Sequence, residues 1–266
     1  MNLILLGDSD FIGPDQTRAI LSDRRARHVI DVHRAQVGQT LRVGLINGPM
    51  GSGRVARIGP RDIELFDIAL NETPPAPLPL ALILALPRPK VLSRVIESVA
   101  ALGVKELVLV NSARVEKSYF ASPRLSEEEV QSALWRGLEQ GRDTVLPRVE
   151  IRERFRPFVE DEAPLRFADA IKLVAHPGTR ERLGEVLSRS PQIDTASAPL
   201  ADTTDGTAFL KRGVIALGPE GGFVPFEVEL LQAQGFRPFH LGERILRVET
   251  AVSFVVGQFV AHGPPV

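Results

Sequence analysis

The sequence predicts two domains, a small and mostly antiparallel β-barrel followed by an α/β domain with a mostly parallel sheet. Three observations support this prediction. Residues 71–79 contain four prolines, a density that neither a helix nor a central strand tolerates. Before them, short segments alternate apolar and polar residues with the period of a strand. After them, apolar strand-like runs alternate with helical periodicity, which is typical of a parallel sheet.

Composition excludes several classes of protein. The 266 residues are 44% hydrophobic and 24% charged, which excludes a disordered or collagen-like chain. Cysteine is absent, so disulfides, thiolate metal sites and cysteine nucleophiles are excluded. The longest apolar run, residues 78–86, is far shorter than the roughly 20 residues of a spanning helix, and residues 1–8 lack the basic start of a signal peptide. We expect a cytoplasmic protein that is not bound to a membrane.

In the first domain, two segments read as strands and one as a helix. Residues 39–45 and 61–67 alternate apolar and polar side chains, as half-buried strands do. The glycine-rich residues 47–53 predict a hairpin loop after the first of them. Residues 23–32 read as a helix with Asp23 at its N-cap. A small β-barrel is the natural closure for strands this short.

The second domain reads as an ordered series of strands and helices. Strands are expected at residues 80–86, 106–110, 171–175, 214–217 and 237–241. Helices are expected at residues 90–102, 126–140, 179–187, 225–234 and 249–262, with Thr179 capping the third of them. The last helix is apolar nearly all round, so we expect it to be buried, either against a partner subunit or within its own domain.

Several catalytic motifs fail on inspection. Residues 48–54 superficially resemble a phosphate-binding loop, but Arg54 and Val55 occupy the positions of the required lysine and Ser/Thr. His28 and His33 are five residues apart, on different helix faces, and no carboxylate completes a metal set. The motifs of zinc and serine hydrolases are also missing from the sequence. We therefore expect no metal.

Two glycine-rich loops are the strongest candidates for a binding site. Residues 214–223 run from a strand into Gly218-Pro-Glu-Gly-Gly222, and residues 241–250 follow a second short strand. Open α/β sheets bind ligands at the carboxyl ends of their strands, so we expect both loops to line one cleft. Thr250 is expected to cap the final helix and to direct its N-terminus into that cleft. The alternative is that both are ordinary turns between strand and helix.

Arginines concentrate in the first domain. Residues 18–61 contain nine arginines and only two acids, Asp23 and Asp31, a local charge of +7 in a chain whose net charge is −1. Because the guanidinium group binds phosphate with two parallel hydrogen bonds, the cluster indicates an anionic polymer as partner. A solvated surface is the alternative.

The paired loops carry a resemblance to a known family. Gly218–Phe223 and, 18 residues later, Leu241–Ala251 resemble the signature of the RsmE family, ribosomal RNA small-subunit methyltransferases that modify ring nitrogen 3 of a uridine. Shorter segments extend the resemblance over nearly the whole chain: Arg27-His28, Pro87–Lys90, Leu102–Val104, Arg114–Ser118 and Glu139-Gln140. One position departs from the family, because Asp143 stands where an arginine is usual and the arginine lies one residue earlier, at Arg142.

This resemblance implies a fold, a cofactor and partners. It implies a PUA-like RNA-binding β-barrel at residues 1–72, a proline-rich linker at 73–79 and a trefoil-knotted SPOUT methyltransferase domain at 80–266. It also implies a homodimer that acts on 16S ribosomal RNA, within the small ribosomal subunit, with S-adenosylmethionine as cofactor. The implied RNA contacts are Arg24, Arg25, Arg27, His28, Arg34 and Arg142. The implied cofactor contacts are Leu217, Gly218, Glu220, Gly221, Gly222, Leu241, Gly242, Ile245, Leu246 and Arg247, with His176, Pro177 and Gly178 as a third wall suggested by topology.

The chemistry requires a base and an anion-stabilising group. The ring nitrogen of uridine must lose a proton before it can attack a sulfonium methyl group. Glu249 is the candidate base, Arg247 the candidate for stabilising the anion, and Thr250 a third candidate. An exposed surface position would contradict the role of Glu249. Two alternatives stay open, a SPOUT methyltransferase acting on another RNA position and a non-catalytic RNA-binding factor in ribosome assembly.

Overall fold

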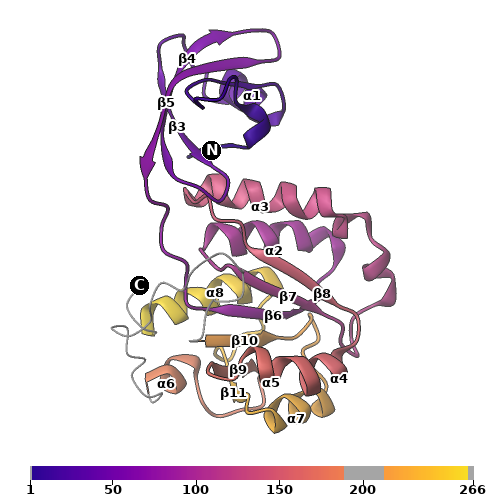
Figure 1. Cartoon of the computed structure of the whole chain (residues 1–266). Coiled ribbons are helices and arrows are strands. Elements are labelled where there is room, and N and C mark those ends of the chain that lie inside the picture. The colour runs from indigo at the N-terminus through magenta and orange to yellow at the C-terminus, as the bar shows by residue number, and fades with distance from the viewer. Residues whose placement is uncertain (1, 189–212, 263–266) are drawn as a thin grey trace. The chain divides into compact units, whose positions relative to one another are not determined.

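The computed structural model describes residues 2–188 and 213–262 and divides the chain into two compact units (Figure 1). Unit 1 comprises residues 1–76 with 134–146, and unit 2 comprises residues 77–133 with 147–266. The first division falls within the proline-rich linker. The domain boundaries expected from sequence did not anticipate that residues 134–146 group with unit 1. Residues 189–212 and 263–266 of the expected second domain lie outside the described residues.

Unit 1 is built on a five-stranded sheet of order β1-β3-β4-β5-β2, in which β1 and β3 run parallel and the other pairs antiparallel. The strands are β1 (Ile4–Leu6), β2 (Ala19–Leu21), β3 (Thr40–Leu45), β4 (Met50–Ile58) and β5 (Ile63–Glu72). The helical segments are η1 (Asp8–Asp10), α1 (Arg24–Arg27) and η2 (His28–Val32), and Asp23 caps α1 by accepting from the backbone amide of Arg25 at 2.8 Å. The mostly antiparallel sheet expected from sequence is confirmed.

The predicted hairpin is formed by β3 and β4, but its loop is shorter than expected. Strand β4 already begins at Met50, so Gly51 and Gly53 lie within the strand. A Cβ atom added to Gly51 would lie 1.8 Å from the carbonyl oxygen of Ala69 on β5. A glycine is therefore needed for the two strands to approach closely, although the same residue type reads as a loop in the sequence.

Residues 134–146 join unit 1 through hydrogen bonds to the β3–β4 turn. The backbone amide of Asn47 donates to the carbonyl oxygen of Thr144 at 2.9 Å, and the Thr144 hydroxyl donates to the carbonyl oxygen of Gly48 at 2.5 Å. The side-chain oxygen of Asn47 accepts from the backbone amide of Leu146 at 2.9 Å. These contacts link positions about a hundred residues apart, which periodicity along the chain does not detect.

Unit 2 contains a six-stranded, all-parallel sheet of order β11-β9-β10-β6-β7-β8. The strands are β6 (Ala81–Ala85), β7 (Glu106–Val110), β8 (Arg148–Arg152), β9 (Ile171–Ala175), β10 (Gly213–Leu217) and β11 (Arg237–Phe239). The main helices are α2 (Pro89–Ala101), α6 (Leu183–Ser188), α7 (Pro225–Ala233) and α8 (Val248–His262). Helix α3 (Glu127–Gly141) begins in this unit, and its residues from 134 onward belong to unit 1. Shorter segments are η3 (Lys117–Ala121), η4 (Pro123–Leu125), α4 (Phe155–Pro157), η5 (Phe158–Glu162) and α5 (Ala163–Arg166). The parallel sheet expected from sequence is confirmed.

Helices cover both faces of this sheet, as in other α/β folds. In Figure 1, α2 and α8, which pack on each other, lie on one face, and α4, α5 and α7 lie on the other. The strands β6, β7 and β10 are buried along their whole length, which explains their continuous apolar sequences. Helix α6 begins at Leu183, four residues after the expected cap at Thr179. The backbone of Arg182 is still extended there and forms an isolated parallel β-bridge with that of His240.

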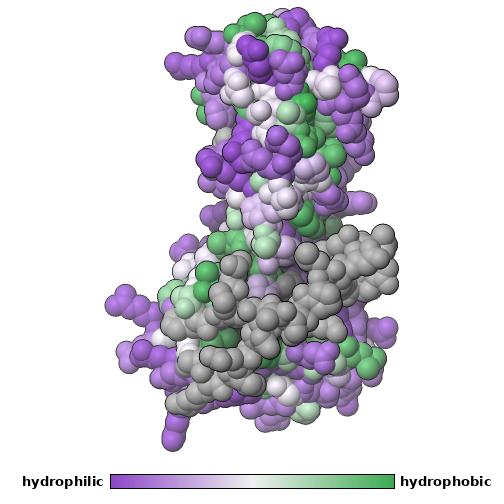
Figure 2. All heavy atoms as spheres, turned by 60° about the vertical axis from the view of Figure 1, so that its left-hand side comes forward, coloured by the Kyte–Doolittle hydropathy of each residue, from purple (hydrophilic) through white to green (hydrophobic). Residues whose placement is uncertain are grey.

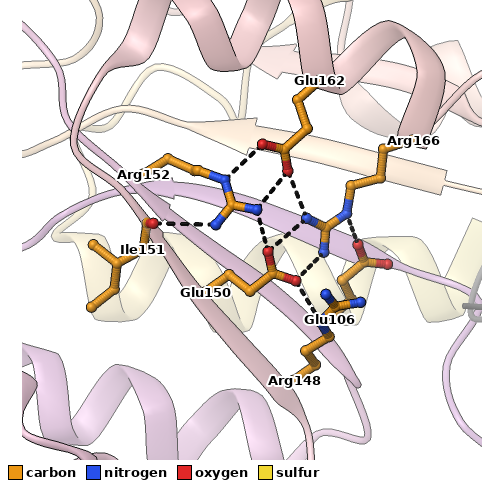
Figure 3. Close-up of polar contacts among 7 residues, drawn as sticks. All are labelled: Glu106, Arg148, Glu150, Ile151, Arg152, Glu162 and Arg166. Atoms are coloured by element: carbon orange, nitrogen blue, oxygen red, sulfur yellow. Dashed lines mark hydrogen bonds and ion pairs between the residues drawn. The ribbon is translucent and has the colours of Figure 1, made fainter. Parts of the chain in front are cut away.

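An ion-pair network attaches the unpredicted segment α4–η5–α5 to the edge of the sheet (Figure 3). Arg166 of α5 donates to Glu106 of β7 at 2.5 Å, to Glu150 of β8 at 2.9 Å and to Glu162 of η5 at 3.1 Å. Arg152 of β8 also donates to Glu162 at 2.7 Å. The charged residues of β8 interrupt the apolar pattern by which a strand is predicted. The same residues fix the position of β8 through their ion pairs.

Helix α8 has one buried and one exposed face. Val252, Val255, Val256 and Phe259 are buried, whereas Phe254 and Val260 are 43% and 47% exposed. We expected the whole helix to be buried, and within this chain only one of its faces is. Throughout residues 2–188 and 213–262, no helix has the length and apolar character that crossing a bilayer requires.

Candidate active site

Three strand ends meet at the edge of the parallel sheet in unit 2. Because β11, β9 and β10 are adjacent and parallel, the loops that follow them emerge side by side. These loops enclose a cavity of about 380 Å³. The expected cofactor residues that line it are His176, Pro177, Leu217, Gly218, Glu220, Gly221, Gly222, Leu241, Gly242, Ile245 and Leu246. Gly178 and Arg247, which were also expected there, are not part of the lining.

The first glycine loop is a tight turn after β10. The backbone amide of Gly222 donates to the carbonyl oxygen of Pro219 at 2.7 Å. A Cβ atom added to Gly218 would lie 2.6 Å from the amide nitrogen of Phe223, so the turn closes only around a glycine. Gly222 has a φ of +72°, and a Cβ atom added there would meet nothing within 4 Å. The loop thus presents bare backbone to open space.

The second loop continues from β11 into α8. Gly242 has a φ of +112°, and a Cβ atom added to it would also meet nothing within 4 Å. Its backbone amide donates to Nδ1 of His240 at 3.1 Å, which holds the start of the loop. The side chains of Glu243, Arg244 and Ile245 are exposed beyond it, and that of Ile245 is 96% exposed.

None of the three expected catalytic residues lines the cavity, although all lie next to it. Arg247 and Glu249 flank Val248, which does line it. Arg247 is exposed, whereas the Glu249 side chain is only 23% exposed, with Oε1 3.9 Å from Nη2 of Arg94 on α2. Glu249 is therefore not in the exposed position that would contradict its role. Thr250 is exposed and does not cap α8, because the helix already begins at Val248 and the carbonyl oxygen of Arg247 accepts from Ala251 at 2.8 Å.

Eight lining residues were not among the expected cofactor contacts: Ala175, Pro219, Phe239, His240, Glu243, Arg244, Val248 and Ala251. His240 is the most informative of them, since its ring accepts the hydrogen bond from Gly242. The signal was present in the sequence, because His240 lies in the predicted strand at residues 237–241, directly before the second glycine loop. It was overlooked because it matched no motif.

Comparison with known proteins decides which family this site belongs to. The model of the RNA methyltransferase domain family matches residues 74–260. Ribosomal RNA small subunit methyltransferase E from Treponema pallidum is 31% identical to this chain over 255 residues, which are 94% of this chain and 87% of that protein. The chain belongs to the ribosomal RNA small subunit methyltransferase E (RsmE) family. A second RsmE, ribosomal RNA small subunit methyltransferase E 1 from Borreliella burgdorferi, is 24% identical over 94% of each chain.

Solved structures agree with this fold over nearly the whole chain. A putative methyltransferase from Legionella pneumophila, in complex with the cofactor SAM, superimposes with a TM-score of 0.72 at 21% identity, covering 98% of this chain and 97% of that one. An RsmE from Neisseria gonorrhoeae, bound to S-adenosyl methionine, superimposes with a TM-score of 0.71 at 20% identity and the same coverage. At these identities the likeness establishes the common fold.

The position where this chain departs from the RsmE pattern follows helix α3. Asp143 is 4% exposed and accepts from the backbone amide of Val145 at 2.9 Å, so it shapes the turn. Arg142 is exposed and has a φ of +56°, the left-handed conformation common where a helix ends. The arginine thus reaches solvent from the position before the usual one.

The RNA contacts expected in unit 1 include exposed side chains and side chains that are paired within the protein. Arg27 and Arg34 are exposed, and His28 is half-buried, with its ring 5.0 Å from that of His33. Burial, followed by nearby positive charges, lowers the pKa of His28. Arg24 is paired with Glu139 at 2.7 Å. Hydrophilic side chains predominate on the face of unit 1 shown in Figure 2.

Arg25 does not agree with its expected role. Its side chain is buried, donates to Asp10 at 2.6 Å and to Asp23 at 3.0 Å, and lies over the ring of Trp135 at 5.1 Å. A guanidinium group committed to two carboxylates and an indole is not available to a phosphate. Arg25 is therefore a structural residue that holds η1 and residues 134–146 to the core of unit 1.

In the folded protein, acidic residues from outside residues 18–61 partly offset the local charge of +7. Acidic residues of β5, beyond the arginine-rich window, pair across the sheet with its arginines. Arg18 pairs with Glu64 and Arg42 with Glu72, while Arg54 lies 3.7 Å from Asp67. Among the arginines of this window, Arg27, Arg34 and Arg61 are the exposed ones for which the described part of the chain provides no ion pair.

Proposed function

We propose that this protein methylates nitrogen 3 of a specific uridine in 16S ribosomal RNA, within the small ribosomal subunit, with S-adenosylmethionine as cofactor. The observation that carries the proposal is the meeting of both RsmE signature loops at one cavity. The RsmE relatives support the target, and the names of two structural neighbours that bind this cofactor support the methyl donor.

The residues at the cavity suit a cofactor of this kind. Its volume of about 380 Å³ lies within the range of small-molecule sites, roughly 300 to 1,000 Å³. Gly222 and Gly242 leave open the space that a Cβ atom would fill, so backbone amides and carbonyls can reach the edges of a nucleoside. Leu217, Leu241 and Leu246 supply apolar walls for the adenine ring. When bound, S-adenosylmethionine supplies an electrophilic methyl group.

Arg247 and Glu249 are the groups proposed to act on the uridine. A carboxylate at Glu249 accepts the proton of ring nitrogen 3, and the guanidinium group of Arg247 stabilises the negative charge that spreads to the neighbouring carbonyl oxygens. Their position on either side of Val248, a lining residue, supports this assignment.

Unit 1 is proposed to bind the RNA backbone and thereby position the target. Arg27, Arg34 and Arg142 present exposed guanidinium groups for phosphate contacts, which give affinity without sequence preference. The mostly antiparallel sheet of unit 1 supports a PUA-like barrel. Selection of the base is then assigned to the cavity of unit 2.

Family membership also supports a trefoil-knotted SPOUT domain and a homodimer. The exposed face of α8, with Phe254 and Val260, is the surface proposed for the contact between subunits. Replacing Phe254 by Asp should shift the protein to a monomer in sedimentation velocity. An unchanged sedimentation coefficient, in protein that remains folded, would place the subunit contact elsewhere.

Mass spectrometry of nucleosides tests the function directly. Small ribosomal subunits from cells lacking this gene are incubated with the purified protein and S-adenosylmethionine, and the RNA is then digested. We expect new 3-methyluridine, with a Gly242→Ala variant as the impaired control. A methylated ribose would indicate another SPOUT activity. Cofactor binding without methylation would point to a different RNA, and neither activity would favour a non-catalytic assembly factor.

A further inference from the structure

The first glycine loop is held from outside the cavity by a buried carboxylate. Glu227, in the first turn of α7, is 4% exposed. Its Oε2 accepts from the backbone amide of Val224 at 2.9 Å, and its Oε1 accepts from the backbone amide of Ala113 at 2.7 Å. Burying a carboxylate is costly unless hydrogen bonds compensate it, so these two amides account for its place in the core. Glu227 thereby joins the end of the glycine loop to the loop that follows β7.

Arg114, the next residue along that loop, makes a second connection. Its Nη1 donates to the carbonyl oxygen of Gly221 and lies 3.5 Å from that of Gly222. Its Cδ would lie 3.0 Å from a Cβ atom added to Gly221, so the arginine side chain lies directly against the glycine. Arg114 thus contacts the loop at Gly221 and Gly222. Ala113 is linked to Val224 through the carboxylate of Glu227.

These contacts matter because a glycine-rich loop has much backbone freedom to lose when it is ordered. Glycines lose more backbone freedom on ordering than other residues, and Gly218, Gly221 and Gly222 all lie within five positions. A site that is ordered before its ligand arrives does not lose binding free energy to that ordering. Contacts made outside the cavity can therefore set its affinity without touching the ligand.

We infer that Glu227 and Arg114 are positioning residues that hold the first glycine loop in the conformation that binds the cofactor. This inference rests on the proposed function for the identity of the ligand. It rests on the contacts of Glu227 and Arg114 alone for the ordering of the loop. It links the loop after β7 to the cofactor site, although no residue of that loop lines the cavity in the described part of the chain.

Two variants test the inference. Glu227→Gln keeps the shape of the side chain but replaces one acceptor by a donor, which faces a backbone N–H. Arg114→Met keeps the aliphatic stem and removes the donors at an exposed position. We expect the Kd for S-adenosylmethionine, from isothermal titration calorimetry, to rise about tenfold in each. We also expect faster hydrogen exchange at the amides of residues 221–224, while circular dichroism stays that of a folded protein.

Glu106→Gln is the matched control. Glu106 is also a buried carboxylate of unit 2, 7% exposed, but it contacts Arg166 and lies outside the cavity. This variant is expected to lower stability while leaving the Kd and the exchange at residues 221–224 unchanged.

The outcomes separate this inference from the proposed function. Hydrogen exchange needs no cofactor, so it decides the ordering of the loop even if wild-type protein fails to bind S-adenosylmethionine. Exchange equal to wild type in both variants would overturn the inference, as would an unchanged Kd beside faster exchange. A wild-type protein that binds the cofactor without methylating uridine would overturn the proposed target alone.

Discussion

Arg24 and Glu139 form an ion pair across 115 positions of the chain, with Nη1 2.7 Å from Oε2. The Glu139 side chain is 2% exposed, and its burial raises the pKa of the carboxyl group, which the hydrogen bond from Arg24 partly offsets. This ion pair, in which the carboxylate is buried, therefore connects helix α1 to the second half of α3 inside unit 1.

Removing Arg24 should destabilise unit 1. Arg24→Ala leaves the buried Glu139 carboxylate without its cation, a change that typically costs about 3 kcal/mol or more. Urea unfolding followed by tryptophan fluorescence measures this, because Trp135 lies in the same segment. Arg27→Ala, an exposed arginine in the same helix, should change stability by less than about 0.5 kcal/mol. Equal losses would show that the ion pair is not responsible.

Exposure predicts which arginines bind RNA. Arg27→Ala and Arg34→Ala should each weaken binding to a small-subunit RNA fragment and reduce the slope of log Kd against log salt by about 0.7 to 0.9. Fluorescence anisotropy over a salt series gives this slope. Arg156→Ala, at an exposed arginine of unit 2, is the control and should leave the slope unchanged. An effect of Arg156 as large as that of Arg27 would argue against unit 1 as the RNA-binding unit.

The network around Arg166 should be a major source of stability in unit 2. Arg166→Ala removes the cation shared by Glu106, Glu150 and Glu162 and should cost about 3 to 5 kcal/mol in chemical denaturation. Arg148→Ala tests the same network at a side chain that is 60% exposed, so its loss should be about 1 kcal/mol or less. The inference fails if the two variants are equally stable.

The ionisation of Glu162 should make the free energy of unfolding depend on pH in the acidic range. Hydrogen bonds from Arg152 lower the pKa of Glu162, although partial burial opposes this. Because the folded-state pKa lies below that of the unfolded chain, this stabilisation is present above the unfolded pKa and is lost as the pH falls from about 5 to 3. Glu162→Gln should therefore be less stable than wild type at pH 7, with a gap that narrows toward pH 3. A gap of constant size would contradict the assignment.

Gly242 should be essential to the cavity rather than to folding. Gly242→Ala places a methyl group in open space at the cavity and strains a backbone with a φ of +112°, so cofactor affinity should fall at least tenfold. Gly38→Ala carries a similar strain, at a φ of +86° with nothing within 4 Å, but lies in unit 1. It should lower the melting temperature without changing the Kd. Equal Kd values for the two variants would mean that Gly242 does not border the cofactor.

Local patterns were sufficient to predict most of the elements of unit 2. The strands at residues 106–110 and 171–175 lie where they were expected, because a buried parallel strand is a short apolar run with clear ends. The two glycine loops were also visible, since their conformations require glycine. Strand β8 was missed because its exposed edge carries Arg148, Glu150 and Arg152 in place of apolar residues.

The roles of the charged side chains depended on tertiary contacts. Arg25 and Arg27 belong to one cluster in the sequence, yet one is buried over Trp135 and the other is exposed. Likewise Glu227, which holds the first glycine loop, looks like any acid in the first turn of a helix. A charged group is stabilised by partners that folding brings from distant positions, and neither composition nor periodicity carries that information. The sequence alone shows where the two glycine loops lie, because their conformations require particular residues at adjacent positions. Which groups hold these loops in place depends on the tertiary structure, because those groups come from distant positions in the chain.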